Sequence, residues 1–281
     1  MKKIGFIDYF LDEWHAENYP AWIEEASGGE YRVCFAYAKI DGTEVGQMSS
    51  RDWTDKHNIT LCDTMEEVIQ KSDVLVILSP DNPEYHEELS TLALQSGKPT
   101  FIDKTFANSK EEAQRIFALA KENGTPVYST SALRYCEEYV ATRKDGISGI
   151  LSVGGGSIYN YSVHQLDPVI CFMGTDAKRV MFLGNDKSPS LVIEFADKRC
   201  AIINHFKDKV PFGLCINYDD GTTENISIES NFFKEFIKEL VDFFETGIPK
   251  VSSEDTIAIM AIREAGLKAA KTPGEWISLD I

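Results

Sequence analysis

The pattern of apolar and polar positions differs between two parts of this chain, and it changes near residue 130. Before it, short apolar runs such as residues 4–7 and 73–78 alternate with longer amphipathic stretches such as residues 108–124. Short apolar runs predict buried strands, and apolar residues at helical spacing predict helices. Strands that alternate with helices in this way predict an α/β domain with a parallel sheet covered on both faces.

Beyond residue 130, strand-like runs follow one another with short polar turns between them. Such neighbours predict a mostly antiparallel sheet, and two amphipathic stretches, residues 231–247 and 253–271, predict helices that complete an α+β domain. We place the boundary between the two domains at residues 125–130. The predicted strand runs lie at residues 151–163, 191–196, 200–206, 212–220 and 222–229.

A third helix is predicted at residues 167–174, where the sequence reads DPVICFMG. Asp167 is expected to cap this helix, with Pro168 at its first position. His164 then falls just before the helix. A histidine at the end of an element can act as an acid or base near neutral pH, although a structural histidine beside an ordinary N-cap explains the same pattern.

Charge and cysteine content narrow the class of protein. The formal net charge of the 281-residue chain is −17, and residues 1–125 hold 12 Lys and Arg against 23 Asp and Glu. Such an acidic chain is a poor partner for nucleic acid or anionic membrane. The six cysteines have no CxxC spacing, which argues against a zinc site and a disulfide framework. With no apolar run long enough for a signal peptide or membrane span, we expect a cytoplasmic protein without a metal site.

Candidate chemistry lies where the predicted parallel strands end, because open parallel sheets bind ligands outside the carboxyl ends of their strands. Asp8, residues 37–39, residues 79–82 and residues 103–105 occupy these positions. Lys104 draws attention because it directly follows a buried strand, where folding does not require a cation. A solvated loop lysine is the alternative explanation.

The order of these motifs resembles the glucose-fructose oxidoreductase, inositol dehydrogenase and rhizopine-catabolism family, written Gfo/Idh/MocA. The resemblance rests on Ser79-Pro80-Asp81-Asn82 followed by His86, on Asp103-Lys104-Thr105, and on His164-Gln165-Leu166-Asp167. It extends to the closing helix and terminal strand over residues 252–279, so it covers nearly the whole chain.

The resemblance implies a Rossmann-like dinucleotide-binding domain over residues 1–126, with NAD or NADP as cofactor. It implies that residues 127–281 form a substrate and oligomerisation domain with an open-faced sheet. The substrate would be a sugar, cyclitol or similar polyol, and the chain a homo-oligomer. Lys104 would contact the nicotinamide ribose and the substrate, and His164 would remove the hydroxyl proton as hydride leaves the same carbon. Asn160 and Asp167 would join them in binding substrate.

The same resemblance assigns ten positions to the cofactor. They are Gly5, Asp8, Phe10, Leu11, Tyr37, Ser79, Pro80, Asp81, His86 and Asp103.

Two departures from the family pattern keep a second function open. The family's Asp is Asn160 here, which cannot carry a negative charge to raise the basicity of His164. The opening stretch IGFIDYFLDEWH places Asp8 and Phe10 where the fingerprint has glycines, and Asp12 and Glu13 follow. Like charge and a phenyl ring would oppose a pyrophosphate. The alternative function is therefore a non-redox ligand-binding or regulatory protein of the same fold. A tightly held cofactor used without net oxidation is a third possibility.

Overall fold

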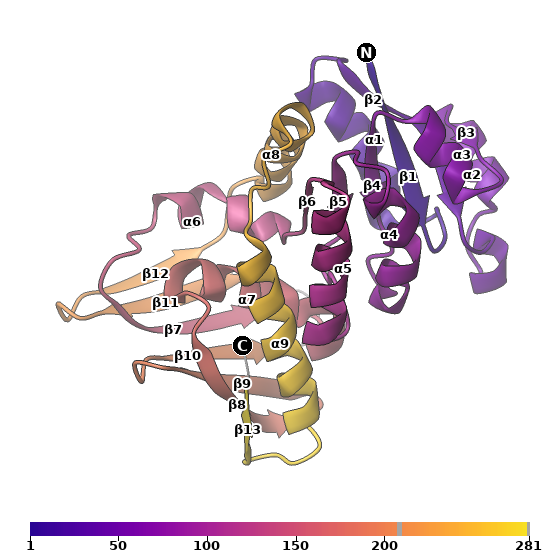
Figure 1. The fold of residues 1–281 in the computed structure, drawn as a ribbon. Coiled ribbons are helices and arrows are strands. Elements are labelled where there is room, and N and C mark those ends of the chain that lie inside the picture. Colours follow the sequence, from indigo (N-terminus) through magenta and orange to yellow (C-terminus); the bar gives the residue numbers. More distant parts are fainter. Residues whose placement is uncertain (207–209, 280–281) are drawn as a thin grey trace. The chain divides into compact units, whose positions relative to one another are not determined.

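The computed structural model describes residues 1–206 and 210–279, and its contacts divide them into two compact units. Of the described residues, the first unit holds 1–107, 111–129 and 234–252, and the second holds 108–110, 130–206, 210–233 and 253–279 (Figure 1). The chain thus leaves the first unit and returns to it for the segment 234–252. The boundary expected at residues 126/127 stays a prediction.

The first unit is built on a six-stranded, all-parallel sheet with the strand order β3-β2-β1-β4-β5-β6. This order is that of a Rossmann fold, which brings the carboxyl ends of β1 and β4 together where the order reverses. Its strands are β1 (Lys2–Asp8), β2 (Tyr31–Ala38), β3 (Thr60–Leu61), β4 (Val74–Ile77), β5 (Thr100–Ile102) and β6 (Val127–Tyr128).

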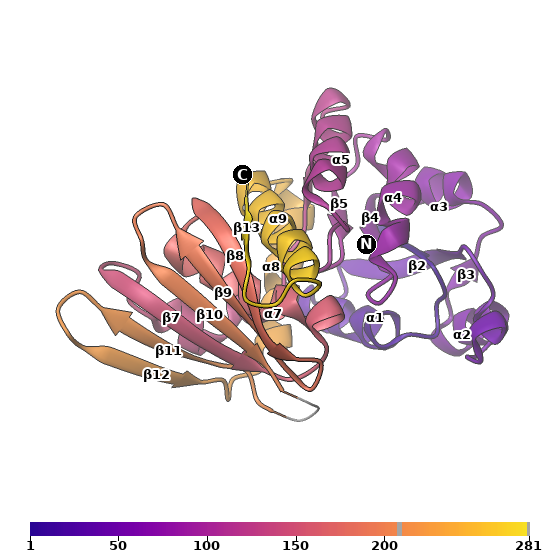
Figure 2. The same cartoon turned by 90° about the horizontal axis from the view of Figure 1, so that it is seen from below.

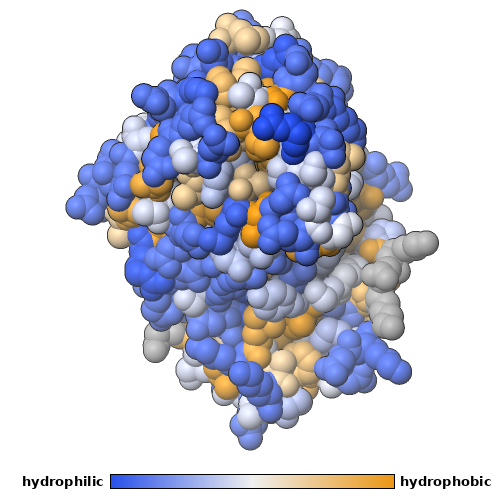
Figure 3. All heavy atoms as spheres, turned by 90° about the vertical axis from the view of Figure 1, so that its right-hand side faces the viewer, coloured by the Kyte–Doolittle hydropathy of each residue, from blue (hydrophilic) through white to orange (hydrophobic). Residues whose placement is uncertain are grey.

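Helices connect these strands, as the sequence pattern predicts. They are α1 (Trp14–Ala26), α2 (Ser50–His57), α3 (Met65–Lys71), α4 (His86–Leu94) and α5 (Lys110–Glu122), with short 3-10 helices η1 (Gly42–Val45) and η2 (Pro83–Tyr85). Pro20 lies inside α1, which stays one helix. The molecular face in Figure 3 is mostly hydrophilic, with apolar residues in small separate areas.

Helix α8 (Phe232–Thr246) adds an aromatic layer to the first unit. The Phe236 ring lies 5.5 Å from that of Phe101 on β5, and the Phe243 ring lies 4.7 Å from that of Tyr128 on β6. All four side chains are buried. Aromatic pairs at these distances stabilise beyond the area they bury.

The second unit contains a seven-stranded mixed sheet with the order β12-β11-β7-β10-β9-β8-β13. Its pairs are antiparallel except β7 with β10, which run parallel. Figures 1 and 2 show α7 and α9 packed on one face of this sheet. The strands are β7 (Ile147–Gly154), β8 (Ala177–Asn185), β9 (Ser188–Phe195), β10 (Cys200–His205), β11 (Gly213–Tyr218), β12 (Thr223–Ser227) and β13 (Trp276–Ser278). The helices are η3 (Ala132–Tyr135), α6 (Glu137–Ala141), α7 (Ile158–Met173) and α9 (Ser253–Ala269).

The strand predicted over residues 151–163 is wrong in its second half, and so is the helix start predicted at Asp167. Strand β7 ends at Gly154, and α7 begins at Ile158 with Ser157 as its N-cap. The Ser157 hydroxyl accepts the N–H of Asn160. This cap outweighs the strand preference of the Ile, Tyr and Val residues that follow. Asp167 and Pro168 are consequently interior helix positions, and His164 lies within the helix.

Candidate functional site

The carboxyl edge of the first sheet gathers four of the predicted residues. Asp8 ends β1, Ser79 follows β4, and Asp103 and Lys104 follow β5. All four are buried, with exposed fractions of 8% for Lys104 and 1% for each of the others. Ser79 has a φ of 71°, in the left-handed region, and its hydroxyl donates to the carbonyl of Asn82. A non-glycine residue in this conformation stores backbone strain, which is typical of functional sites.

Asp103 forms a buried pair with His15, the second residue of α1. The Asp103 Oδ2 lies 2.7 Å from His15 Nδ1, and Oδ1 accepts the Lys104 N–H. The His15 ring stacks on Tyr19, with centroids 5.0 Å apart. Burial by itself lowers the pKa of His15, but Asp103 outweighs it and the net shift is upward. Burial likewise opposes the charge of Asp103, yet His15 and Lys104 hold its pKa below the usual range. The pair is therefore a charged, oriented dyad.

Two further carboxyl groups lie beside this dyad, and both resist ionisation. Burial raises the pKa of Asp8 well above its usual value, although the Tyr9 N–H bound to Oδ1 opposes the shift. The other oxygen, Oδ2, has no hydrogen-bond partner among the residues described. Burial, with the nearby Asp8, raises the pKa of Glu13 to about 8. Desolvation and mutual repulsion are the physical causes.

The N-terminus of α1 is occupied by the side chain of its own N-cap, Glu13. Glu13 Oε2 accepts the N–H of His15 at 2.7 Å, and Oε1 accepts the N–H of Ala16 at 2.5 Å. These two N–H groups, which we call the phosphate seat, stand where a Rossmann fold receives the pyrophosphate of its dinucleotide. The seat is thus filled by a protein carboxyl group.

Lys104 is buried and hydrogen-bonded, so it is not a solvated loop lysine. Its Nζ donates to the carbonyl of Pro80 at 2.6 Å, which links the loops after β4 and β5. Thr105, next to it, is 1% exposed. This position, at the carboxyl edge of a parallel sheet, is where such folds bind ligands.

The remaining predicted cofactor positions divide into packing and edge residues. Gly5 lies inside β1 facing α3, where an added Cβ would meet Val68 and Ser72 at 2.4 Å. His86 is fully buried, with Nε2 2.6 Å from the carbonyl of Leu78, and burial lowers its pKa. Leu11 is also buried. Phe10, Tyr37 and Pro80 are partly exposed, and Asp81 is exposed.

In the second unit, His164 and Asn160 stand one turn apart on α7 and share a face of the helix. Both are partly exposed. The Nδ1 of His164 lies 2.8 Å from the Ser131 hydroxyl, and its ring contacts those of Tyr161 and Phe212. A hydrogen bond at one ring nitrogen orients an imidazole and sets which nitrogen carries the proton.

Asp167, predicted to bind substrate, is buried in a network within the second unit. It accepts the N–H of Ser131 at 2.6 Å and the Nε of Arg134 at 2.5 Å. Arg134 also pairs with Asp255 on α9 at 3.1 Å, and these carboxylates help to raise its pKa against the effect of burial. Asp167 therefore fixes the loop that carries Ser131, the partner of His164.

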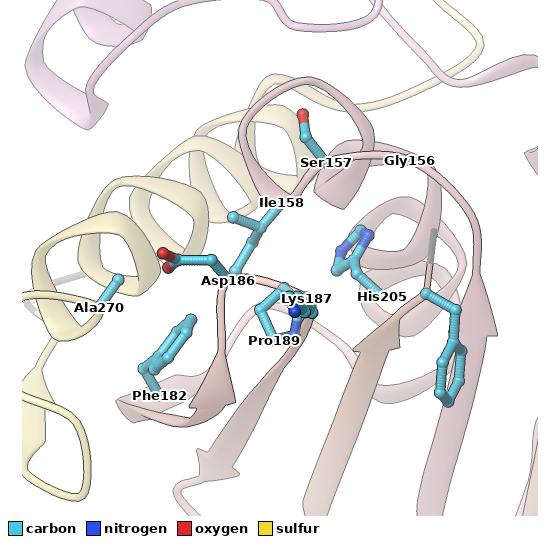
Figure 4. A pocket seen from close by; sticks show the side chains of 10 residues that line it. Gly156, Ser157, Ile158, Phe182, Asp186, Lys187, Pro189, His205 and Ala270 are labelled. Carbon is cyan, nitrogen blue, oxygen red and sulfur yellow. The ribbon is translucent and has the colours of Figure 1, made fainter. Parts of the chain in front are cut away.

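A pocket of about 430 Å³ lies elsewhere in the second unit, at the start of α7 (Figure 4). Ser157, Ile158, Phe182, Pro189 and His205 are among its lining residues. Burial lowers the pKa of His205 to about 4, so this ring is neutral at physiological pH. The residues predicted for catalysis do not line this pocket.

Comparison with known proteins shows which family part of the chain resembles. Residues 43–131 match the model of the oxidoreductase family with an NAD-binding Rossmann fold, GFO_IDH_MocA. This match covers less than half of the chain and shows a similarity to the Gfo/Idh/MocA family. The matched segment includes Lys104 and begins after the opening stretch that holds Asp8 and Glu13.

Two curated relatives share part of the chain. The inositol 2-dehydrogenase of Klebsiella pneumoniae strain 342 is 31% identical over 133 residues, which are 41% of this chain and 40% of that protein. The uncharacterized oxidoreductase YhhX of Escherichia coli K12 is 25% identical over 132 residues, or 39% of this chain and 38% of that protein. The aligned regions therefore span less than half the length of either relative.

Solved structures share the fold over nearly the whole chain. The scyllo-inositol dehydrogenase of Lactobacillus casei, crystallised with NAD(H) and scyllo-inositol, superposes with a TM-score of 0.78 at 14% identity. The superposition covers 99% of this chain and 98% of that one. The predicted two-domain α/β architecture is confirmed.

The phosphate seat does not fit a dinucleotide in the manner of a Rossmann fingerprint. Glu13 holds the two N–H groups that a pyrophosphate would need, and Asp8 stands buried beside them without a partner for Oδ2. Burial raises the pKa of both carboxyl groups, so the obstacle to a pyrophosphate is the occupation of these N–H groups and not repulsion between like charges. Among the residues described, the structure holds no group of three His, Cys, Asp or Glu side chains suited to a metal ion.

Sequence reasoning missed the role of three residues. The sequence offers His15 only as a possible ligand-binding residue at the phosphate position and Glu13 only as a charge there, because their partners lie far along the chain or in the backbone. Ser131 has no signal beyond its place at the end of the strand-like run over residues 126–131. Within the described part of the chain, no helix combines the length and apolar character needed to cross a membrane.

Proposed function

We propose that the chain is an oxidoreductase of a sugar, cyclitol or similar polyol that works with NAD or NADP. The observation that carries this proposal is the family match over residues 43–131, which includes the buried, ordered Lys104. The 31% identical inositol 2-dehydrogenase of Klebsiella pneumoniae supports the substrate class. The nicotinamide dinucleotide would supply the hydride acceptor, and the residues below prepare the substrate.

His164 is the proposed acid and base. When the Ser131 hydroxyl accepts the Nδ1–H of His164, Nε2 carries the lone pair that takes a proton from a substrate hydroxyl. Asp167 and Arg134 keep Ser131 in place through the Ser131 N–H and the buried ion pair. Asn160, on the same face of α7, would donate to or accept from a substrate hydroxyl without adding charge.

Lys104 is the proposed positioning cation of the first unit. Its ammonium group donates to the carbonyl of Pro80 and has further donors for a polyol oxygen. A cation close to a hydroxyl oxygen favours loss of the hydroxyl proton, because it stabilises the developing negative charge.

Turnover with a panel of inositols and sugars, followed by nicotinamide absorbance with each cofactor, tests this function. We expect wild type to reduce one cofactor with at least one polyol, and K104A and H164A to lower kcat/KM by at least about a hundredfold. The surface variant K121A should behave as wild type, since Lys121 is exposed on α5. Full activity in both site variants would contradict the proposed roles.

A non-redox ligand-binding or regulatory protein is the second candidate function. The Glu13 carboxyl on the phosphate seat favours it, because the family's cofactor contacts are replaced there. If wild type binds neither NADH nor NADPH at millimolar concentration, the oxidoreductase proposal fails and this candidate stands.

A cytoplasmic location and a homo-oligomer built through the C-terminal sheet complete the proposal. All six cysteines are free thiols in the structure, which agrees with a reducing compartment. Sedimentation of the purified protein would decide the oligomeric state: a single species at the mass of one chain would contradict the oligomer.

A further inference from the structure

The β1–α1 loop of the first unit is built differently from a glycine-rich phosphate loop. Backbone pairing between the two neighbouring strands continues past the end of β1: the Lys39 N–H donates to the Asp8 carbonyl and the Ile40 N–H to the Tyr9 carbonyl, each at 2.9 Å. The strand pairing therefore extends one residue beyond β1, to Tyr9, before the loop bends toward α1. A fingerprint loop instead turns tightly at a glycine so that backbone can approach the phosphates.

Side-chain contacts within the first unit also hold the β1–α1 loop in place. The Asp12 carboxylate accepts the N–H of Met48 at 2.8 Å, which ties the loop after β1 to the loop after β2. The Tyr9 ring stacks on Tyr85, with centroids 4.3 Å apart and an interplanar angle of 9°. Asp12 and Tyr9, which make these contacts, both belong to the loop that stands in place of the glycine-rich fingerprint.

Glu13 is the part of this loop that meets the phosphate seat itself. Its two carboxyl oxygens bind two consecutive N–H groups of α1, those of His15 and Ala16. Two acceptor oxygens on consecutive N–H groups at a helix N-terminus reproduce the way such a site holds a phosphate. A pyrophosphate can reach these groups only when the Glu13 side chain has left them.

We propose that Glu13 occupies the phosphate seat in place of a dinucleotide pyrophosphate, and that this occupancy keeps nicotinamide dinucleotide binding in the first unit weak. The inference rests on the proposed function in one respect, namely that NAD or NADP is the ligand with which Glu13 competes. A cofactor held weakly in this way is an exchangeable co-substrate and does not stay with the protein between turnovers.

The variant E13S tests the proposal with little harm to the fold. Serine is a preferred N-cap, so its hydroxyl can accept one N–H of the first turn and preserve α1, while the carboxyl group is gone. E25S is the matched control, because Glu25 lies exposed in the last turn of the same helix. Circular dichroism and thermal unfolding establish that each full-length variant is folded.

NADH, NADPH and ADP are titrated separately into wild type, E13S and E25S by isothermal calorimetry, with Trp14 fluorescence as a second readout. We expect E13S to bind at least one of these ligands at least tenfold more tightly than wild type, and E25S to match wild type. If E13S should not fold, E13Q replaces it, with a smaller expected gain since an amide offers one acceptor oxygen.

The outcomes separate this inference from the proposed function. Tight binding by wild type that E13S does not improve overturns the inference and leaves the oxidoreductase proposal standing. Binding by E13S where wild type shows none at millimolar ligand supports the inference and contradicts the cofactor part of the proposed function. Absence of binding by every variant overturns both.

Discussion

At the scale of single residues, the opening stretch of the chain forms a cluster of carboxyl groups around one imidazole. Asp103 keeps its charge because His15 and Lys104 stabilise it, whereas Asp8 and Glu13 hold their protons more tightly than in water. Carboxyl groups at the same edge of the sheet therefore have pKa values shifted in opposite directions. The pKa of Asp103 is lowered and those of Asp8 and Glu13 are raised, because their surroundings differ.

Glu13 should make stability fall as the pH rises. Its pKa is about 8 in the folded chain, against roughly 4.3 for an unfolded chain, so folding takes up a proton between these values. Its stabilising contribution is complete below about pH 4 and is lost as the pH rises through about 8, with a slope of at most about 1.4 kcal/mol per pH unit. Urea unfolding of E13Q should show a shallower decline than wild type. Equal slopes would contradict the shifted pKa.

Removing the charge of one partner of the His15–Asp103 pair should lower the stability of the folded chain. D103N leaves His15 buried without its carboxylate, and we expect the free energy of unfolding to fall by about 3 kcal/mol. E87Q is the control, because the Glu87–Arg115 pair is exposed and such pairs contribute at most about 1 kcal/mol. Chemical denaturation measures both. A loss below about 1 kcal/mol for D103N would show that the pair contributes little to the stability of the fold.

At the scale of elements, Gly5 illustrates how a predicted site residue can serve packing. Its φ is not in the left-handed region, but an added Cβ would lie 2.4 Å from Val68 and Ser72 of the α3 segment. We expect G5A to cost about 1–3 kcal/mol, as overpacked cores do. The double variant G5A/V68A should be less destabilised than the sum of the two single variants, since V68A removes the Val68 Cγ1 atom that would clash, while Ser72 Oγ stays at the same distance. Strict additivity in urea unfolding would contradict this account.

Most strands and helices of the first unit could be predicted because their apolar runs, caps and glycine stops agree with one another, but the mostly polar helix α2 and the two-residue strand β3 give no such signal. Residues 158–163 could not, because their Ile, Tyr and Val side chains favour strands and only the Ser157 cap starts the helix. The position of Lys104 and the resemblance to the Gfo/Idh/MocA family follow from the order of motifs. The His15–Asp103 pair could not be foreseen, because 88 residues separate its members and only the fold brings them together.

At the scale of the whole molecule, the path of the chain joins distant segments into one core. Helix α8 follows the second sheet in sequence, yet residues 234–252 group with the first unit, where Phe243 meets Tyr128. From the sequence pattern alone, this helix is assigned to the second domain, in which it occurs. Contacts between segments far apart in the sequence cannot be read from the spacing of apolar residues.

Truncating this contact should loosen the first unit. Phe243 is fully buried, so F243A should lower the free energy of unfolding by about 3–5 kcal/mol. Hydrogen exchange should quicken at β5 and β6, the strands that α8 covers. The control I248A alters an exposed residue of the same segment and should change neither measurement. Faster exchange confined to the second unit would contradict the grouping of α8.

Glu13 fills the phosphate seat in a chain that shares the fold of inositol dehydrogenases. The most direct measurement is a mass spectrum of the small molecules released by heat from freshly purified wild type and E13S, prepared side by side. We predict no stoichiometric NAD or NADP from wild type and a clear increase from E13S. One equivalent of dinucleotide released from wild type would contradict the claim.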